Sequence, residues 1–277
     1  MVIDGKKIAQ RKLSKLKSEV KKKNLNLQLD ILYIGKNTSS EIFIRNKIAS
    51  AEKAGIKVKV HTFPTKVSED TIRATCNNLN LDPNCTGYFF QLPIAKHLDE
   101  EKMVDLIAEE KDVDCLTSKN LGKILFEKGD SLKPAPVEAI LSILRYLNVR
   151  LKSKVITIIN DSNLIGKPLT THLLTKDATV IVCNSSTKNL SQFTRKADII
   201  ITAAGKVNLI TKTMIKKNSI VIDAGITRKD GKVVGDTDFE NVSKVAKAIT
   251  PVPGGVGPLT VICLLENVLK IYKKNNE

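Results

Sequence analysis

The chain has 277 residues, 42% of them hydrophobic and 4% aromatic, which fits a soluble α/β protein large enough for two domains. Its formal charge of +16 suggests nucleic-acid binding, but only seven of its 45 basic residues are Arg, and 45 − 7 leaves 38 Lys scattered among acidic residues. No apolar run has the length of a signal peptide or of a membrane span, which takes about 18 residues. We therefore expect a cytoplasmic protein that binds neither nucleic acid nor membrane.

The elements predicted in the first half alternate between helix and strand. Helical spacing of apolar residues covers 5–23, and a capping-box pattern from Thr38 to Glu41 opens a helix that stops at Gly55. The expected helices are 5–23, 38–54, 68–79 and 100–108, and the expected strands are 27–35, 57–62 and 87–92. Residues 109–136 are less regular. This alternation predicts a parallel sheet.

A second α/β series follows a predicted helix at 137–149. Its expected strands are 154–160, 178–183, 197–203 and 219–223, with a helix after Gly166 and a last helix from Leu259 onward. The series is typical of a Rossmann-like domain whose first βα turn is 160–166. We predict two domains, 1–137 and 138–258, with the C-terminal helix 259–277 packing back on the first.

The cysteines and histidines give no sign of a metal site or a disulfide framework. The cysteines are odd in number, no pair has C-x-x-C spacing, and the three histidines are isolated. We expect no metal, and we expect Cys76, Cys85, Cys115, Cys183 and Cys263 to be small core residues.

The loop TPVPGGVGPLT (250–260) is the most unusual stretch, with three prolines and three glycines in eleven residues. Proline fixes φ and glycine allows close backbone approach, so the loop has a fixed shape and a bare backbone face. Pro258 suits the first turn of the following helix. The loop is either an ordinary turn before a helix or a wall against a flat ring or a phosphate.

Two polar residues are candidates for catalysis. Phe43 and Lys47 stand four apart on one face of a predicted helix, and a lysine desolvated in a cleft can exchange a proton near neutral pH. Gln91 lies at the carboxyl end of a strand, where parallel sheets place ligand contacts. The alternatives are a solvated helix lysine and a strand-end polar cap.

Two further motifs combine carboxylates with turn residues. In Lys111-Asp112-Val113-Asp114, the two acids either form an ion-paired turn or hold a ligand's N–H groups. The turn from Asn160 through Asp161 and Ser162 to Gly166 lacks the first two glycines of a dinucleotide fingerprint. Ser185 follows the next strand, within reach of an adenosine ribose.

Together these motifs resemble the bifunctional methylenetetrahydrofolate dehydrogenase/methenyltetrahydrofolate cyclohydrolase family over essentially the whole chain. The most specific parts are KDVD (111–114), the S-x-x-x-G-x-P turn (162–168), GD-x-DF (235–239) and the loop 250–260. The resemblance implies a folate-binding catalytic domain, a dinucleotide-binding domain, a cleft between them and a homodimer. It also implies tetrahydrofolate derivatives as substrates and NADP or NAD as cofactor.

The resemblance also assigns roles to individual residues. The catalytic set is Lys47, Gln91 and Asp114, with Asp114 anchoring the pterin and Lys47 shuttling a proton in the hydrolytic step. The substrate-binding set adds Phe43, Pro253, Gly254 and Gly255. The cofactor-binding set is Asn160, Asp161, Ser162, Gly166, Ser185, Ile226 and Thr260.

The chain departs from the family pattern at three places. Phe43 replaces a tyrosine, which removes a hydroxyl that would tune Lys47, so the cyclohydrolase is the less secure activity. Asp161 replaces an arginine that pairs with the 2′-phosphate of NADP, which weakens the expected preference for NADP and favours possible use of NAD. Cys115 replaces a glycine, and Ala135 and Val137 alter a Pro-Cys-Thr-Pro stretch.

These departures leave two alternatives to the bifunctional enzyme. One is a diverged family member that retains only one activity or only ligand binding. The other is a basic nucleic-acid-binding protein, for which salt-dependent retention of DNA would be the sign.

Overall fold

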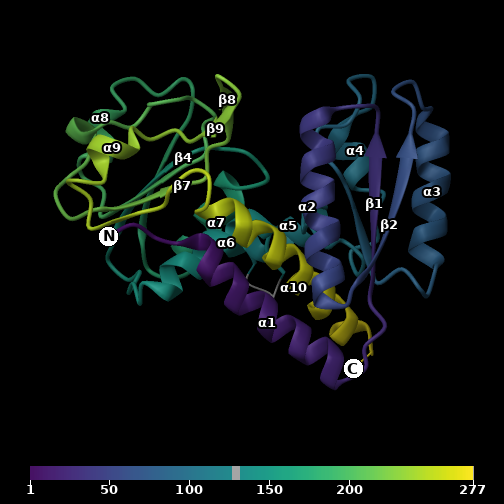
Figure 1. The fold of residues 1–277 in the computed structure, drawn as a ribbon. Helices are drawn as coiled ribbons and strands as arrows, with labels where there is room; N and C mark the ends of the chain where they lie inside the picture. The colour runs from purple at the N-terminus through teal and green to yellow at the C-terminus, as the bar shows by residue number, and fades with distance from the viewer. Residues whose placement is uncertain (127–131, 277) are drawn as a thin grey trace. The chain divides into compact units, whose positions relative to one another are not determined.

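The computed structural model describes residues 1–126 and 132–276, which divide between two compact units. Gln10–Ala135 and Val261–Glu277 form the three-stranded unit, and Met1–Ala9 and Pro136–Thr260 form the five-stranded unit, each named after its main sheet. Helices and strands alternate in both (Figure 1), and both main sheets are parallel throughout. The predicted α/β class with parallel sheets is confirmed.

The three-stranded unit has the strand order β2-β1-β3. Its elements are β1 (Gln28–Ile34), β2 (Lys57–Phe63), β3 (Gly87–Phe90), α2 (Thr38–Ala54), α3 (Glu69–Leu81), α4 (Glu100–Val104), α5 (Ser118–Leu125) and most of α1 (Gly5–Lys22) and α10 (Val256–Asn276). From central β1 the chain crosses through α2 to one neighbour, and α3 returns it to the other. The carboxyl ends of β1 and β3 are therefore a topological switch point, where open α/β sheets bind ligands.

The five-stranded unit has the order β10-β7-β6-β4-β5, so its switch point lies at the carboxyl end of β4. Its elements are α6 (Ala135–Tyr146), β4 (Val155–Ile159), α7 (Gly166–Leu174), β5 (Thr179–Cys183), α8 (Ser191–Thr194), β6 (Ile199–Thr202), η1 (Lys212–Met214), β7 (Ile220–Asp223), β8 (Thr227–Lys229), β9 (Lys232–Val234), α9 (Phe239–Val242) and β10 (Ala248–Ile249). Strands β8 and β9 form a separate antiparallel hairpin. Residue Val2 bridges to Ile249, which extends the edge beyond β10.

Each unit has an apolar core of its own. Leu32, Ile72 and Phe90 belong to one cluster under the three-stranded sheet, and Ile200 and Val221 belong to another in the five-stranded unit. The five cysteines are buried, as the sequence predicts, and none of them forms a disulfide. Within residues 1–126 and 132–276, every helix is too short or too polar to span a bilayer.

Helices α1 and α10 are joined by two ion pairs within the three-stranded unit. Lys12 Nζ lies 2.7 Å from Glu266 Oε2, and Lys273 Nζ lies 2.6 Å from Glu19 Oε1. The two pairs are seven residues apart on each helix, so the helices run parallel. Their apolar faces are buried, and the lysines of α1 cover its outer face.

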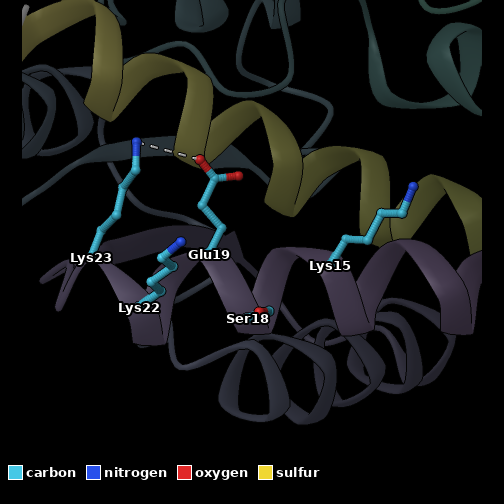
Figure 2. A pocket seen from close by; sticks show the side chains of 5 residues that line it. All are labelled: Lys15, Ser18, Glu19, Lys22 and Lys23. Atoms are coloured by element: carbon cyan, nitrogen blue, oxygen red, sulfur yellow. Dashed lines mark ion pairs between the residues drawn. The ribbon is translucent and has the colours of Figure 1, made fainter.

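A shallow hollow lies on this basic outer face (Figure 2). It is lined by Lys15, Ser18, Glu19, Lys22 and Lys23 of α1. Glu19 is its one carboxylate, and the ammonium of Lys23 lies 3.8 Å from it, a surface pair of the kind that contributes about 0–1 kcal/mol. The side chains that line this hollow are mostly exposed, so we interpret it as a solvated surface rather than as a catalytic site.

The structure differs from the predicted elements in a few places. Helix α2 spans Thr38–Ala54, as predicted, and the Oδ1 of Asn37 accepts the N–H of Ser40 in its first turn. Helix α4 ends at Val104, four residues before the predicted end. Helix α5 lies in the stretch that the sequence pattern left irregular; its N-cap is Thr117, whose hydroxyl accepts the N–H of Asn120.

The boundary between the compact units is not a single point in the sequence. Residues 10–22 of α1 and 261–276 of α10 belong to the three-stranded unit, whereas the first residues of both helices belong to the five-stranded unit. The division of function between 1–137 and 138–258 stays a prediction.

Candidate active site

Two side chains at the carboxyl end of strand β3 face helix α2. Phe89 and Gln91 are two apart, so their side chains lie on the same side of the sheet. Gln91 follows the carboxyl end of β3, and its backbone N–H donates to Leu32 O of β1 at 2.9 Å. Gln91 thus lies at the switch point, in the position that the sequence predicts for a ligand contact.

Lys47 of α2 reaches this face of the sheet. Its Nζ donates to Gln91 Oε1 at 3.0 Å and lies 4.1 Å from the centre of the Phe89 ring. Gln91 Nε2 donates to Leu92 O at 2.9 Å, which fixes the amide with its oxygen toward the lysine. The interpretation of Lys47 as one more solvated surface lysine is therefore wrong.

The surroundings of Lys47 lower its affinity for a proton. Burial lowers the pKa of Lys47, and the charge of Asp114 partly opposes this effect. Gln91 accepts a hydrogen bond from either protonation state of the amine, so it orients the nitrogen without demanding a charge. The ring of Phe89 favours the cation. A lysine in this position can both take up and release a proton.

Three of the four residues of the KDVD motif have structural roles. Lys111 Nζ donates to Leu79 O and Asp82 O, each at 2.6 Å, at the end of α3. Asp112 is fully buried and accepts the N–H of Thr117 at 2.9 Å, which supports the start of α5. Val113 belongs to the core. The alternative of an ion-paired turn is wrong for Lys111, since its ammonium binds carbonyl oxygens.

Asp114 is the remaining residue of the motif and is half-buried. Burial raises the pKa of Asp114 to about 6; Lys47 lowers it and Asp112 raises it further. Lys47 donates to Gln91, and the charges of Lys47 and Asp114 act on each other, so we treat Lys47, Gln91 and Asp114 as one cluster. A half-buried carboxylate of this kind can accept hydrogen bonds from a ring that carries adjacent N–H groups.

Phe43 lies one helical turn before Lys47 and is 41% exposed. An exposed aromatic ring beside a proton-transfer group is suited to stacking on a flat ligand. The ring has no hydroxyl, so it adds no hydrogen bond to Lys47.

The first βα turn of the five-stranded unit is held closed by Asn160. Its Oδ1 accepts N–H groups from Ser162 at 3.0 Å and Gly166 at 2.9 Å, and its Nδ2 donates to Ala203 O at 2.8 Å. A Cβ on Gly166 would overlap the backbone of Asn160, so glycine is required there. Asn160 and Gly166 thus shape the turn.

Exposed residues line the same edge of this sheet. Asp161 is exposed, and its Oδ2 accepts from Asn184 Nδ2 at 3.1 Å, which ties the turn to the end of β5 beside the exposed Ser185. Ile226 follows β7 and is 51% exposed, an unusual exposure for so large an apolar residue. Leu164 in the turn is 36% exposed. These residues offer a carboxylate and hydroxyl for sugar contacts and apolar surface for a ring.

The loop 250–260 has the rigid geometry that its composition predicts. The Val252–Pro253 peptide is cis, Gly254 has φ 109°, and a Cβ on Gly255 would overlap Thr250 and Pro251. Helix α10 starts at Val256, so Pro258 lies in its first turn as predicted. Thr260 donates to Val256 O at 3.3 Å in this turn.

The GD-x-DF motif interlocks with the end of β7. Asp223 accepts the N–H of Thr237 at 2.8 Å, and a Cβ on Gly235 would overlap the Asp223 carboxylate. Asp236 accepts from Thr202 Oγ1 at 2.7 Å. The motif is therefore structural in the five-stranded unit.

We expect Gly235→Ala to lower the unfolding free energy by about 1–3 kcal/mol, because the new methyl group overpacks a buried carboxylate. Urea denaturation of the purified variant measures the change. The control is Gly122→Ala in α5, where a Cβ meets no atom within 4 Å. That change should gain about 0.5–1 kcal/mol of helix stability. Equal stability of Gly235→Ala and the wild type would contradict the interlock.

Sequence patterns did not identify two residues that the structure adds to the site. Phe89 lies under the ammonium of Lys47, and its spacing of two from Gln91 was the available signal. Asn267 of α10 is fully buried and donates to Val113 O, next to Asp114. Residues 1–126 and 132–276 contain no cluster of three or more His, Cys, Asp or Glu arranged to hold a metal ion.

Comparisons with known proteins identify the family of this chain. Residues 3–114 match the tetrahydrofolate dehydrogenase/cyclohydrolase catalytic domain, and residues 134–276 match the NAD(P)-binding domain of the same family. The bifunctional protein FolD of Mycoplasma capricolum is 42% identical over 281 residues, which cover 99% of each chain.

Two solved structures are similar over nearly the full length. The bifunctional enzyme FolD, methylenetetrahydrofolate dehydrogenase/cyclohydrolase, of Campylobacter jejuni has a TM-score of 0.96 at 37% identity, with 99% of each chain covered. The Trypanosoma brucei enzyme, complexed with NADP and an inhibitor, has a TM-score of 0.95 at 31% identity, covering 100% of this chain and 98% of its own. This chain therefore belongs to the tetrahydrofolate dehydrogenase/cyclohydrolase family.

Proposed function

We propose that the chain oxidises 5,10-methylenetetrahydrofolate to 5,10-methenyltetrahydrofolate and hydrolyses the product to 10-formyltetrahydrofolate. The observation that carries the proposal is the cluster of Lys47, Gln91 and Asp114 at the switch point of the three-stranded unit. Family membership supplies the substrate class, and the cluster supplies the groups that the hydrolytic step requires.

The oxidation needs little chemistry from the protein. Hydride leaves the methylene carbon with help from a folate nitrogen lone pair, so no general base is required and positioning dominates. We assign Asp114 to the N–H groups of the pterin and Phe43 to stacking on a ring of the substrate. Pro253, Gly254 and Gly255 are proposed as further substrate contacts, supported by their rigid and bare backbone.

The hydrolysis needs movement of a proton. Water adds to the methenyl carbon and loses one proton to give a neutral hydroxyl intermediate. As the ring opens to the formyl product, a ring nitrogen gains a proton and the hydroxyl loses its own to solvent, so one proton is released overall. Neutral Lys47 would accept the first proton and return it as the ammonium, and Gln91 would hold the nitrogen in place in both states. The lowered pKa of Lys47, which burial causes, makes the neutral form accessible.

The residues of the five-stranded unit fit a nicotinamide dinucleotide. When bound, the nicotinamide ring of NADP or NAD supplies the hydride acceptor. Asp161 and Ser185 would bind sugar hydroxyls, Ile226 would cover a ring, and Ser162 and Gly166 would form the turn. Thr260 is proposed as a further contact. Because Asp161 places a negative charge at this turn, we propose that NAD is preferred over NADP.

The ionisation of Asp114 predicts a pH dependence. Its pKa of about 6 lies above the usual 3.8, chiefly because of burial, so the carboxylate that accepts pterin N–H groups is lost below about pH 6. The kcat/KM for the folate substrate should rise through pH 6 and then level off, and Asp114→Asn should remove this rise. A profile that is flat from pH 5 to 7 in the wild-type enzyme would contradict the role of Asp114.

The same pKa has a defined effect on stability. The folded state binds this proton more tightly than the unfolded chain does, so the contribution of Asp114 to the unfolding free energy falls as the pH rises from about 4 to about 6. Denaturation of Asp114→Asn across this range should lack that contribution.

The direct test is turnover by the purified protein. Methylenetetrahydrofolate with NAD or NADP should give reduced nucleotide, and methenyltetrahydrofolate alone should be hydrolysed. Absence of both reactions would overturn the proposal.

Two broader properties are proposed from the family resemblance. We expect a homodimer, and sedimentation equilibrium that gives the mass of one chain would contradict this. We also expect the protein in the cytoplasm, which fractionation of source cells tests.

A further inference from the structure

Asn267 is a polar residue in the most apolar surroundings of α10. It is fully buried, as are its neighbours Leu264, Val268 and Ile271. Burial of an unpaired amide costs several kcal/mol, so such a residue normally has all its polar atoms bonded. The hydrogen bonds of Asn267 therefore indicate why an amide side chain is present at this position.

Both amide protons of Asn267 bind backbone carbonyls of irregular segments. Nδ2 donates to Val113 O at 2.9 Å and to Lys133 O at 3.0 Å, residues that are 154 and 134 positions away in the sequence. Neither carbonyl lies in a helix or strand, so the side chain supplies hydrogen bonds to irregular backbone. All three residues belong to the three-stranded unit.

The acceptor atom of Asn267 has no such partner. Within residues 1–126 and 132–276, Oδ1 is buried and makes no hydrogen bond. An unpaired buried acceptor destabilises the fold. The amide is thus not the best residue for stability alone, and its value lies in the two carbonyls that it holds.

Those carbonyls fix the backbone beside Asp114. Val113 O belongs to the peptide group whose N–H is that of Asp114, so the bond to Asn267 sets the orientation of this peptide plane. On the other side, Cys115 has φ 56° and its Sγ donates to Leu132 O at 3.2 Å. The turn that carries Asp114 is therefore fastened to residues 132–133 from both sides.

We propose that Asn267 is a positioning residue that holds the Asp114 carboxylate in its productive orientation for the folate substrate. The proposal rests on the proposed function, in which Asp114 binds the pterin. Asn267 itself acts only through the Val113–Asp114 peptide.

The test is the variant Asn267→Leu. Leucine has the same number and branching of side-chain heavy atoms as asparagine, but it lacks the unpaired oxygen and leaves both carbonyls without the amide donor. The KM for the folate substrate should rise about tenfold, the effect of losing hydrogen bonds that hold the binding group. The KM for the nucleotide should not change. A purely structural role would lower the amount of active enzyme and leave both KM values unchanged, which would overturn the proposal.

A matched control comes from the same helix. Asn275 is exposed, and its Nδ2 donates to Glu110 O at 3.0 Å, a bond of the same type four residues before Asp114. Asn275→Leu should leave both KM values unchanged. Asn267→Ser keeps one donor, so it should have an intermediate effect, and it serves as the test variant if Asn267→Leu does not fold.

The double variant with Asp114→Asn shows whether the effect passes through Asp114. In that background Asn267→Leu should cause no further rise in folate KM. An equal rise in both backgrounds would overturn the proposal. Calorimetric binding of tetrahydrofolate gives the same comparison without turnover, so failure of the catalytic function and failure of the positioning role can be told apart. If the wild-type protein does not bind tetrahydrofolate, both fail.

Discussion

Replacing Lys47 by Met should abolish hydrolysis of methenyltetrahydrofolate, with a loss of about 10²–10⁴-fold, the usual contribution of a positioned proton-transfer group. Methionine is unbranched and similar in length, and it keeps an apolar contact with the ring of Phe89. The fold should therefore survive. Nucleotide binding should be unchanged, because every residue proposed to contact the nucleotide belongs to the five-stranded unit. Stopped-flow or steady-state absorbance of the methenyl compound measures the rate.

Three choices make this experiment specific. Lys47→Arg keeps the charge but cannot release a proton near neutral pH, so it should lose hydrolysis as Met does if Lys47 shuttles a proton. Lys53→Met, at an exposed position of the same helix, should have no effect. Because Lys47 lowers the pKa of Asp114, that pKa should rise in Lys47→Met, so hydrolysis is measured over a range of pH to separate this effect from the loss of the proton shuttle. Hydrolysis by Lys47→Met at the wild-type rate would remove Lys47 from the mechanism.

The periodic elements of the fold were predictable because their signals are local. The apolar strand 28–34 and the helix 38–54 follow from residue spacing, and the alternation of strand and helix implies parallel sheets. Helix α5 escaped prediction because it is short and mostly polar, and its start is supported by the buried Asp112 from outside the helix. The start of α2 at Thr38 was predicted correctly, because the residues around it include good helix caps.

The site was predictable only where residue type and position coincide. The sequence identified Gln91 at a strand end and Lys47 on one face of the helix 38–54, and the structure joins them by a hydrogen bond. Residue spacing alone did not separate Asp112 from Asp114, since two acids two residues apart look alike in a sequence, and only the family resemblance selected Asp114. The role of Asn267 could not be predicted from the sequence, because its hydrogen-bond partners are more than 130 residues away.

Cys115 illustrates a signal that the sequence contained but did not explain. The family pattern has glycine at this position, and the structure has φ 56° there, in the left-handed region that favours glycine. The cysteine is buried and its thiol bonds to Leu132 O, so a side-chain contact offsets the backbone cost. The departure at this position therefore preserves the turn that carries Asp114.

The second large effect concerns the nucleotide. The wild-type protein should use NAD with a higher kcat/KM than NADP, by about fivefold to a thousandfold. The range follows from one to four kcal/mol of repulsion between a carboxylate and a phosphate about 4 Å apart, at dielectric constants from that of water to that of a protein surface. Asp161 is exposed and anchored by Asn184, and its remaining lone pairs suit the ribose hydroxyl that NAD carries in place of the phosphate.

Variants at Asp161 should shift this preference stepwise. Asp161→Asn removes the charge and keeps an oxygen for Asn184, so kcat/KM with NADP should rise by about tenfold with little change for NAD. Asp161→Arg should raise it further, because a guanidinium binds phosphate bidentately. Glu240→Arg makes the same charge change at another exposed position of this unit and should not alter the ratio of kcat/KM with NAD to kcat/KM with NADP.

High salt should narrow the difference in kcat/KM between the two nucleotides in the wild-type enzyme, because screening weakens repulsion between exposed charges. A wild-type preference for NADP that persists in Asp161→Arg would show that this turn does not read the 2′ position.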